Sequence, residues 1–284
     1  MTFDSYDFLN NLSIVVLIGW VISQTKAFTD ICPHALRQKT ARARWWVAAV
    51  EFVVISYSGV LLLLVLNRKF GIWFTEGNSN YYGSLTAYLL AYAILTPLLG
   101  ISTLRSLDLF TPGLALSLVV SKMACFSCGC CSSFEMPGSF YYSYTTHRHE
   151  FPVQLLEAAV ALMLFIFLLW YRKRGHRSGT VFPVYVIAYS VTRFFVQFLR
   201  TDISKIHGRI DAYHTMSVIF LIIGLLLLWF VRVSGDSVNA YFDKKLVIKK
   251  SNGVKAGKKR TANAKDSNKG SKKKSAKGNN KNRR

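Results

Sequence analysis

The stretch "FPVQLLEAAVALMLFIFLLWY", residues 151 to 171, holds a single charged side chain, that of Glu157, in 21 positions. A helix needs about 20 predominantly apolar residues to cross the hydrocarbon core of a bilayer. The run ends in Trp170 and Tyr171 and is followed by the basic turn "RKRGHR", residues 172 to 177. Aromatic residues favour the membrane interface, and basic residues favour the cytoplasmic side. The stretch therefore predicts a membrane-spanning helix that ends at the cytoplasmic side.

Six other windows have a similar apolar composition. Hydrophobic residues make up 51% of the 284 positions, which is high for a soluble protein. We therefore expect an all-α integral membrane protein with about seven transmembrane helices. These are placed at residues 8–25, 45–66, 84–104, 107–128, 151–171, 181–200 and 213–232.

The distribution of basic residues predicts the orientation of these helices. Lys and Arg gather in the segments that follow the first, fifth and seventh windows, and cytoplasmic loops carry such an excess. The N-terminus and the loop at residues 129–150 are then outside, and the C-terminus is cytoplasmic. Because Asp4 and Asp7 stand where a signal peptide would be basic, the first helix is expected to be retained.

The chain divides by composition into a polytopic transmembrane domain, residues 1–242, and a basic tail, residues 243–284. The tail has 17 basic and two acidic residues, a net charge of +15 out of +22 for the whole chain. With almost nothing apolar to bury, it is expected to be disordered in the cytoplasm. Its charge suits the anionic surface of the membrane, and no specific recognition of nucleic acid is expected.

Lys122, Glu157 and Arg193 are ionisable residues inside predicted membrane helices, and Glu51 is a further acid nearer the inner boundary. Counted along their helices, the first three all lie roughly 10 Å below the outer surface. Charges at this depth are costly unless they are paired or hydrated. Two cations and one acid leave a positive surplus that an anionic ligand would balance. The alternative is a purely structural bridge between Glu157 and Arg193, with Lys122 snorkelling outward.

Polar residues near these charges repeat at helical spacing. Tyr189, Arg193, Gln197 and Arg200 recur at i, i+4, i+8 and i+11, which places them on one helical face. Gln154 precedes Glu157 by three residues and shares its face. These residues are therefore candidates for the same site.

Four of the five cysteines lie in "CFSCGCC", residues 125 to 131. Facing an oxidising compartment they could form a disulfide. Four thiolates could also bind zinc or an iron cluster, although no second ligand pair follows at a typical spacing. Packed, half-buried thiols are the third interpretation, and composition leaves all three open.

Three stretches resemble the prolipoprotein diacylglyceryl transferase family: "DLFTPGLALSLVVSKMACF" (residues 108–126), "FPVQLLEA" (151–158) and "VYVIAYSVTRFFVQFLRTD" (184–202). The resemblance covers roughly residues 81–228. It implies a bacterial cell-membrane enzyme with seven spans. Such an enzyme moves a diacylglyceryl group from phosphatidylglycerol to a cysteine thiol of a lipoprotein precursor at the outer face. Its partners would be the phospholipid donor and the precursor peptide, with no cofactor and no metal ion.

The resemblance also implies which residues form the site. Arg193 and Glu157 match polar positions of the family's motifs, and Tyr82 takes the place of a histidine important for activity, so these three are the candidate catalytic residues. The candidate substrate-binding residues are Lys122, Cys125, Cys128, Gly129, Cys130, Gln154, Tyr189, Gln197 and Arg200.

The chain departs from the family pattern at several of these positions. In the signature, Lys122 replaces an arginine, Cys125 and Cys128 replace asparagines, and Cys130 replaces a glutamate, while Phe126 matches. Gln197 replaces an acid. Two alternatives follow: a non-catalytic lipid-binding protein of the same fold, and a thiol redox or metal-binding membrane protein centred on residues 125–131.

Overall fold

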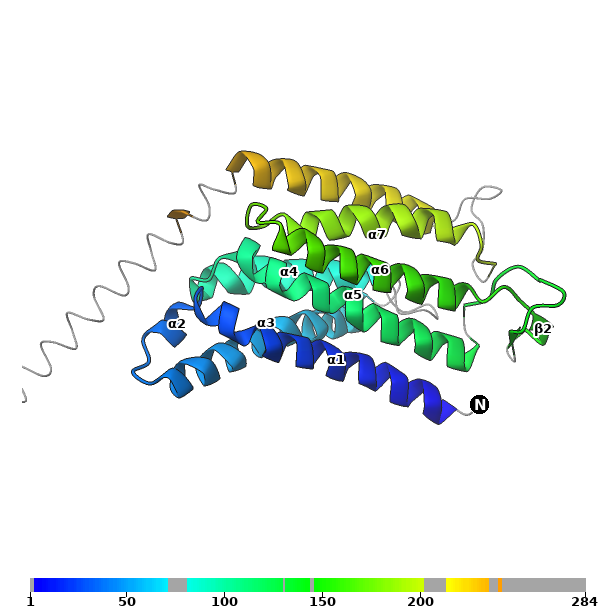
Figure 1. Cartoon of the computed structure of the whole chain (residues 1–284), viewed down its shortest axis with the longest axis horizontal. Helices are drawn as coiled ribbons and strands as arrows, with labels where there is room; N and C mark the ends of the chain where they lie inside the picture. Colours follow the sequence, from blue (N-terminus) through cyan, green and yellow to red (C-terminus); the bar gives the residue numbers. More distant parts are fainter. Residues whose placement is uncertain are drawn as a thin grey trace, which may run out of the picture.

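The computed structural model describes residues 3–70, 81–129, 131–143, 146–201, 213–234 and 240–241 (Figure 1). The described chain is mostly helical. Its helices are α1 (Phe3–Thr29), α2 (Pro33–Leu36), α3 (Ala41–Phe70), α4 (Tyr81–Leu99), α5 (Thr103–Cys128), α6 (Val153–Lys173), α7 (Val181–Gln197) and a further helix over Tyr213–Ser234. A two-stranded antiparallel sheet, β1 (Tyr142–Ser143) with β2 (Arg148–His149), lies between α5 and α6.

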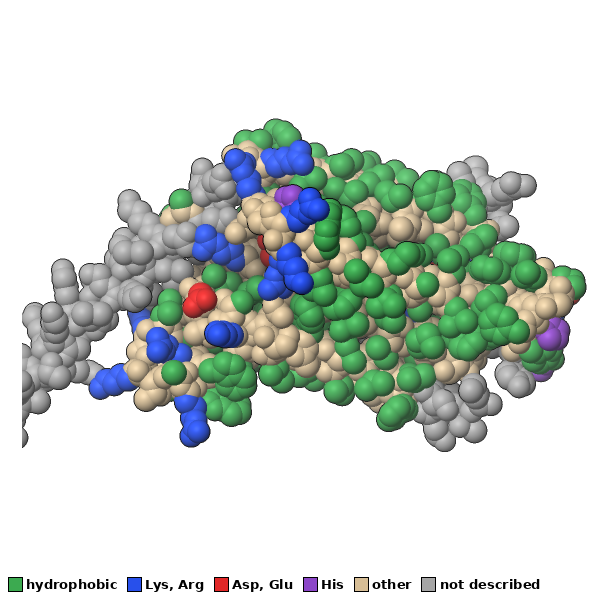
Figure 2. All heavy atoms as spheres, in the orientation of Figure 1, with side chains coloured by type: hydrophobic (Ala, Val, Ile, Leu, Met, Phe, Trp, Pro, Cys, Tyr) green, Lys and Arg blue, Asp and Glu red, His purple; other side chains and the backbone are tan. Residues whose placement is uncertain are grey.

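Four helices of the described chain are long and apolar enough to cross a membrane: Phe8–Thr29, Thr103–Cys128, Val153–Lys173 and Tyr213–Ser234. Two shorter apolar helices, Leu85–Leu99 and Val181–Gln197, accompany them. Figure 2 shows hydrophobic side chains over the middle of the molecule and basic side chains near the end that carries α2. An apolar surface of this extent suits a lipid environment. The prediction of an all-α membrane protein is confirmed at this level.

Helix α5 lies in the middle of the bundle. It packs against α1 on one side and α6 on the other, while α7 contacts both α5 and α6 (Figure 1). Helix α3 pairs with α4 and α1. The α1 contact is close because Gly113 of α5 has no side chain: a Cβ there would lie 2.4 Å from the Trp20 ring. The Trp20 indole N–H donates to the Leu109 carbonyl (2.9 Å), which fixes α1 along α5.

The predicted boundary between the third and fourth membrane helices was wrong. The window 84–104 was expected to be continuous, but α4 ends at Leu99 and α5 begins at Thr103. Gly100 adopts a left-handed φ of 74°. Its N–H donates to the Pro97 carbonyl, and the Ile101 N–H donates to the Thr96 carbonyl (2.8 Å). This pair of bonds is a Schellman cap, which ends a helix at a glycine.

The sixth window also ends earlier than predicted. Helix α7 stops at Gln197, and three successive i→i−3 bonds follow, the last from Arg200 N–H to the Gln197 carbonyl (3.2 Å). This tight 3₁₀-type turn carries Arg200 beyond the helix. Arg200 then pairs with Ser133 in an isolated antiparallel bridge, so its position depends on tertiary structure rather than on helical spacing.

The segment at 129–150 folds back on itself at the end of the bundle where α1 begins (Figure 1). The Glu150 carboxylate accepts from the backbone N–H of Ser133 (3.0 Å) and from the Thr146 hydroxyl (2.5 Å). Phe134 and Phe151 stack with ring centroids 5.4 Å apart. These contacts hold the segment against the start of α6.

At the other end, Cys32 joins α2 to α3. Its buried thiol donates to the Glu51 carboxylate (2.9 Å), and its sulfur accepts from the Ala35 N–H (3.4 Å). His34 Nδ1 lies 2.9 Å from the same carboxylate. Burial, followed by the hydrogen bond to Glu51, raises the pKa of the Cys32 thiol to about 12.

Candidate active site

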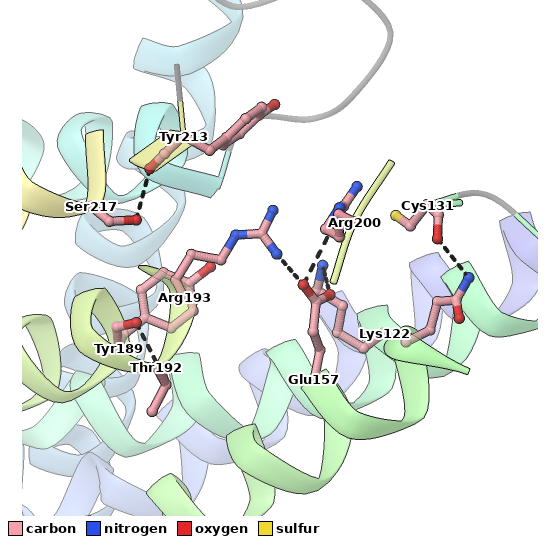
Figure 3. Close-up of polar contacts among 10 residues, drawn as sticks. Lys122, Cys131, Glu157, Tyr189, Thr192, Arg193, Arg200, Tyr213 and Ser217 are labelled. Atoms are coloured by element: carbon pink, nitrogen blue, oxygen red, sulfur yellow. Dashed lines mark hydrogen bonds and ion pairs between the residues drawn. The ribbon is translucent and has the colours of Figure 1, made fainter. Parts of the chain in front are cut away.

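Four charged side chains from three helices and one turn converge near the end of the bundle that carries the 129–150 segment (Figure 3). We call Lys122 of α5, Glu157 of α6, Arg193 of α7 and Arg200 of the following turn the Glu157 cluster. The structure thus brings together the three residues for which the sequence predicted a common depth, and adds Arg200 to them.

Glu157 is the common partner of the three cations. Lys122 Nζ lies 2.6 Å from Glu157 Oε2, Arg193 contacts Oε1 directly, and an Arg200 guanidinium nitrogen lies 3.5 Å from Oε1. The Lys122 side chain is only 15% exposed, so it does not snorkel outward. One carboxylate faces three cations, and the cluster therefore has a net charge of +2 in buried surroundings.

Arg200 is held by the segment that follows the cysteine-rich stretch. The Thr201 N–H donates to the Ser132 carbonyl (3.0 Å), and the Thr201 hydroxyl donates to the Ser133 carbonyl (3.0 Å). Sequence reasoning missed this contact, because nothing local in either segment indicates that Thr201 and Ser133, 68 positions apart in the chain, lie together. The 129–150 segment therefore helps to build the site.

The described cysteines of the 125–131 stretch lie at the end of α5 and in the turn after it. Cys125 and Cys128 are half-buried on the last helical turn, and the Cys128 thiol donates to the Cys125 carbonyl (3.5 Å). Gly129 (φ 70°) ends the helix, and Cys131 is buried with a φ of 70°. Cys130 lies outside the described residues. Within the described ranges no three His, Cys, Asp or Glu side chains group as a metal site.

Gln154 connects this turn to α6. Its side-chain amide donates to the Cys131 carbonyl (3.0 Å) and lies 3.4 Å from the Tyr141 hydroxyl, and Tyr141 stacks on Phe126 with centroids 4.8 Å apart. Sequence reasoning did not anticipate a role for Tyr141. The one feature that could have indicated it is the presence of an aromatic residue in a polar loop. Gln154 thus fixes the backbone around Cys131 above the cluster.

The remaining predicted residues are distributed as follows. Tyr189 and Gln197 are buried on α7, together with Arg193. Tyr82 lies in the first turn of α4, but its side chain is outside the described part of the molecule. Tyr213, not predicted from the sequence, places its ring centroid 5.5 Å from the Arg193 guanidinium carbon, a distance suited to a cation–π contact.

A small pocket lies between α5, α6 and α7 beside the cluster. Lys122, Glu157 and Arg193 form its polar part. Its other walls are mainly apolar, formed by Leu118, Val160, Ala161, Leu164 and Val196, with Tyr189 and Thr192. The pocket therefore combines cationic groups with an apolar lining, which suits an amphipathic anion.

The family model described as prolipoprotein diacylglyceryl transferase matches residues 13–230, which include every residue of the cluster and the pocket. The chain belongs to the prolipoprotein diacylglyceryl transferase family. The resemblance predicted for residues 81–228 is confirmed, and the match to the family extends to α1 and α3.

Several members of the family share part of their sequence with this chain. It is 30% identical over 152 residues to phosphatidylglycerol–prolipoprotein diacylglyceryl transferase 2 of Clostridium perfringens, covering 51% of this chain and 59% of that protein. The corresponding enzyme of Clostridium tetani is 32% identical over 128 residues, covering 43% and 51%. That of Lactobacillus acidophilus is 29% identical over 181 residues, covering 58% and 63%. The chain thus spans between half and two thirds of the length of these relatives.

Proposed function

We propose that the protein transfers the diacylglyceryl group of phosphatidylglycerol to the thiol of a cysteine in a lipoprotein precursor. The observation that carries the proposal is the Glu157 cluster, with its surplus of two positive charges beside an apolar pocket. The relatives named above are transferases of this kind. The donor lipid and the precursor peptide are therefore the proposed substrates.

The cations of the cluster are suited to the phosphate of the donor. Arg193 and Arg200 are guanidinium groups, which bind phosphate oxygens in a bidentate manner. Lys122 adds a third positive charge without that planar geometry. A phosphodiester carries one negative charge, so it would reduce the cluster's surplus from +2 to +1. The cations would also stabilise the negative charge that develops on the leaving phosphate.

The pocket between α5, α6 and α7 is suited to the apolar part of the donor. Leu118 lies one helical turn before Lys122 on α5, and Leu164 lies two turns after Glu157 on α6. The apolar wall therefore continues from the charged cluster toward the middle of the bundle. An acyl chain in this wall would hold the glyceryl carbon near the three cations.

The reaction forms one bond and breaks one. The precursor sulfur bonds to the glyceryl carbon, and the bond from that carbon to the phosphate oxygen breaks, so that glycerol phosphate leaves with the bonding electrons. The thiol proton can pass to the leaving phosphate, which balances charge. Glu157 contacts three cations and is a weak base for that reason, so its proposed role is to orient Arg193 and Arg200.

The other predicted residues take supporting roles in this proposal. Tyr82 would complete the catalytic group at the position where the family has a histidine. Cys125, Cys128 and Gly129 at the end of α5, together with Cys130 next to them in the sequence, would line the entrance for the substrates. Gln154, Tyr189 and Gln197 would hold the polar wall through their buried side chains.

The proposal includes a seven-helix topology in the bacterial plasma membrane, with the N-terminus outside. Residues 1–242 would form the membrane domain, and residues 243–284 a cytoplasmic tail that contacts anionic lipids. The start of α1 and the 129–150 segment share one end of the bundle (Figure 1), which supports this arrangement. Basic side chains gather toward the opposite end (Figure 2), as the positive-inside rule requires.

The test is a transfer assay on the purified chain in detergent. It uses phosphatidylglycerol labelled in its acyl chains and a peptide with a lipobox cysteine. Label should reach the peptide thiol with the unaltered protein and with Arg148→Ala, an exposed arginine of the outer segment. Arg193→Ala should abolish transfer while keeping the protein monodisperse.

The alternatives give different outcomes in the same assay. Retained phospholipid without any transfer by the unaltered protein would indicate a non-catalytic lipid-binding protein. Transfer that persists in Arg193→Ala would remove the cluster from the mechanism. A dependence on the oxidation state of the clustered cysteines, rather than on Arg193, would favour the thiol redox alternative.

A further inference from the structure

A second charged recess lies at the opposite end of the same helices. It occupies about 270 Å³ between the end of α1, the start of α5, the end of α6 and the turn into α7. Its charged lining consists of Arg105, Asp108, Arg172 and Arg177, with His176 beside them. We call these five residues the basic recess. Figure 2 shows basic side chains gathered around a hollow at this end of the molecule.

Asp108 fixes the turn that carries part of this recess. Its carboxylate accepts from the backbone N–H groups of Gly179 (2.5 Å), Val181 (3.0 Å) and Phe182 (3.3 Å). Val181 and Phe182 carry the first N–H groups of α7, which attract negative charge, and Gly179 lies in the turn just before the helix. A Cβ on Gly179 would lie 2.8 Å from Leu104 Cβ, so the turn sits directly against α5. The Asp108 carboxylate therefore binds the backbone at the start of α7.

The arginines leave a positive surplus in the recess. Three guanidinium groups and one carboxylate give a net charge of +2 without His176. Arg172 donates to the side-chain oxygen of Gln24 (2.7 Å), and Arg177 donates to the backbone carbonyl of Arg232 (2.7 Å). Both acceptors are neutral, so these contacts position the guanidinium groups without cancelling their charge.

The wall of the recess is partly apolar. Ala27, Ile31, Leu109 and Val181 line it beside the arginines. A small hydrated anion would gain nothing from these residues, whereas a lipid would cover them with its glycerol backbone and the first carbons of its chains. The combination of guanidinium groups and apolar wall therefore favours a phosphate that is part of a lipid.

This recess is separate from the Glu157 cluster. Arg105 and Lys122 are both on α5 and are 17 residues apart, which corresponds to roughly 25 Å along the helix axis. One phospholipid headgroup cannot contact both. We propose that the basic recess is a second lipid site, which binds the phosphate headgroup of an anionic phospholipid in the leaflet opposite to the transfer reaction.

The test uses the full chain in nanodiscs of phosphatidylcholine. The probe is phosphatidic acid with a photoreactive group near the glycerol end of one acyl chain, and its comparison is a phosphatidylcholine with the same group. After irradiation, labelled peptides are mapped by mass spectrometry. Peptides that contain residues 105–109 and 172–181 should be labelled by the phosphatidic acid probe roughly tenfold more than by the phosphatidylcholine probe.

Matched variants identify the charges responsible. Arg105→Gln, Arg172→Gln and Arg177→Gln together should lower this labelling roughly tenfold. Arg37→Gln, Lys39→Gln and Arg42→Gln together remove the same charge from exposed positions at this end of the chain, and should leave labelling unchanged. If the first triple variant does not fold, Ser178→Glu, compared with Ser178→Gln, adds a repelling charge to the turn and should have the same effect.

Three outcomes would overturn the proposal. Equal labelling by both probes would mean unselective contact with surrounding lipid. An equal loss in the two triple variants would mean a general surface charge effect. Displacement of the label by inorganic phosphate at the concentration of the probe would mean a site for a soluble anion. None of these variants alters Arg193, so the result is independent of the transfer assay.

Discussion

Lys122 Nζ and Glu157 Oε2 lie 2.6 Å apart, although the two residues belong to different helices and are separated by the whole 129–150 segment. The same carboxylate also contacts Arg193 and Arg200. Three cations therefore share one anion in a buried position. An arrangement of this kind is stable with its carboxylate in place and attracts a second anion, because a single negative charge cannot neutralise it.

Replacing Glu157 should damage both stability and activity. Glu157→Gln leaves three buried cations without their anion, and loss of one partner from a buried charge pair costs about 3 to 5 kcal/mol. The free energy of unfolding, measured by denaturant titration in detergent, should fall by an amount of this order. Transfer should fall with it, because Arg193 and Arg200 lose their common partner.

Glu135→Gln is the matched control. Glu135 is 60% exposed and lies 3.8 Å from Arg148, and an exposed pair of this kind contributes about 0 to 1 kcal/mol. An equal loss of stability in the Glu135 and Glu157 variants would contradict the importance assigned to the cluster.

Substitution of Lys122 tests whether the lack of a guanidinium group at this position limits the rate of transfer. Lys122→Arg introduces the arginine that the resemblance to the family signature implies at this position and adds a bidentate donor, so kcat/KM should be retained or rise about two- to fivefold. Lys122→Gln removes the charge and should lower kcat/KM about tenfold or more. Steady-state transfer kinetics on phosphatidylglycerol would measure both. A Gln variant as active as the unaltered protein would exclude Lys122 from phosphate binding.

The clustered cysteines should be dispensable for the transfer chemistry. Cys128→Ser together with Cys130→Ser removes two thiols without changing side-chain size greatly, and transfer should stay within about threefold of the unaltered protein. The measurement is the same assay, run with and without a reductant. A complete loss of transfer in this double serine variant would point to thiol chemistry in the site.

Asp108 should stabilise the junction of α5 with α7. Asp108→Asn retains one acceptor oxygen but places an amide N–H₂ against backbone donors, and a buried group without its partner costs about 1 to 3 kcal/mol. Thermal unfolding should therefore occur at a lower temperature. Asp30→Asn, at an exposed position after α1, should leave the unfolding temperature unchanged, and a similar decrease in both variants would argue against the cap.

Cys32 should be unreactive in the folded protein. Its thiol pKa is raised to about 12 by burial and by the bond to Glu51, so it stays protonated at pH 8, and only the thiolate reacts readily with maleimides. Modification of Cys32, followed by peptide mass spectrometry, should occur only after unfolding. Rapid modification of the native protein would show that Cys32 is accessible.

The same pKa shift predicts a pH dependence of stability. The pKa of the Cys32 thiol in the folded protein is above the ordinary value of about 9. The contribution of this thiol to the free energy of unfolding is therefore fully present below pH 9 and is lost as the pH rises toward 12. Cys32→Ala should make the free energy of unfolding less dependent on pH in that range. An unchanged slope between pH 9 and 11 would assign the alkaline dependence to other groups.

The sequence by itself indicated where most of the described helices lie and which ionisable residues interrupt their apolar faces. Apolar runs of membrane length, basic residues at their ends and the spacing of Tyr189, Arg193 and Gln197 are local properties, because hydropathy and helical periodicity depend on neighbouring residues. They predicted most helix boundaries within a few residues and placed Lys122, Glu157 and Arg193 at one depth. The stretches at residues 108–126, 151–158 and 184–202 also sufficed to show a resemblance to the prolipoprotein diacylglyceryl transferase family.

Only the tertiary structure decided how these residues meet. The early end of α4 depends on a cap at Gly100, and the place of Arg200 depends on Ser133 and Thr201, which hold a turn beyond the end of α7. The convergence of three cations on Glu157 depends on the packing of α5, α6 and α7. Contacts between segments far apart in the chain follow from the burial of complementary helix faces, and no periodicity within a single segment records them.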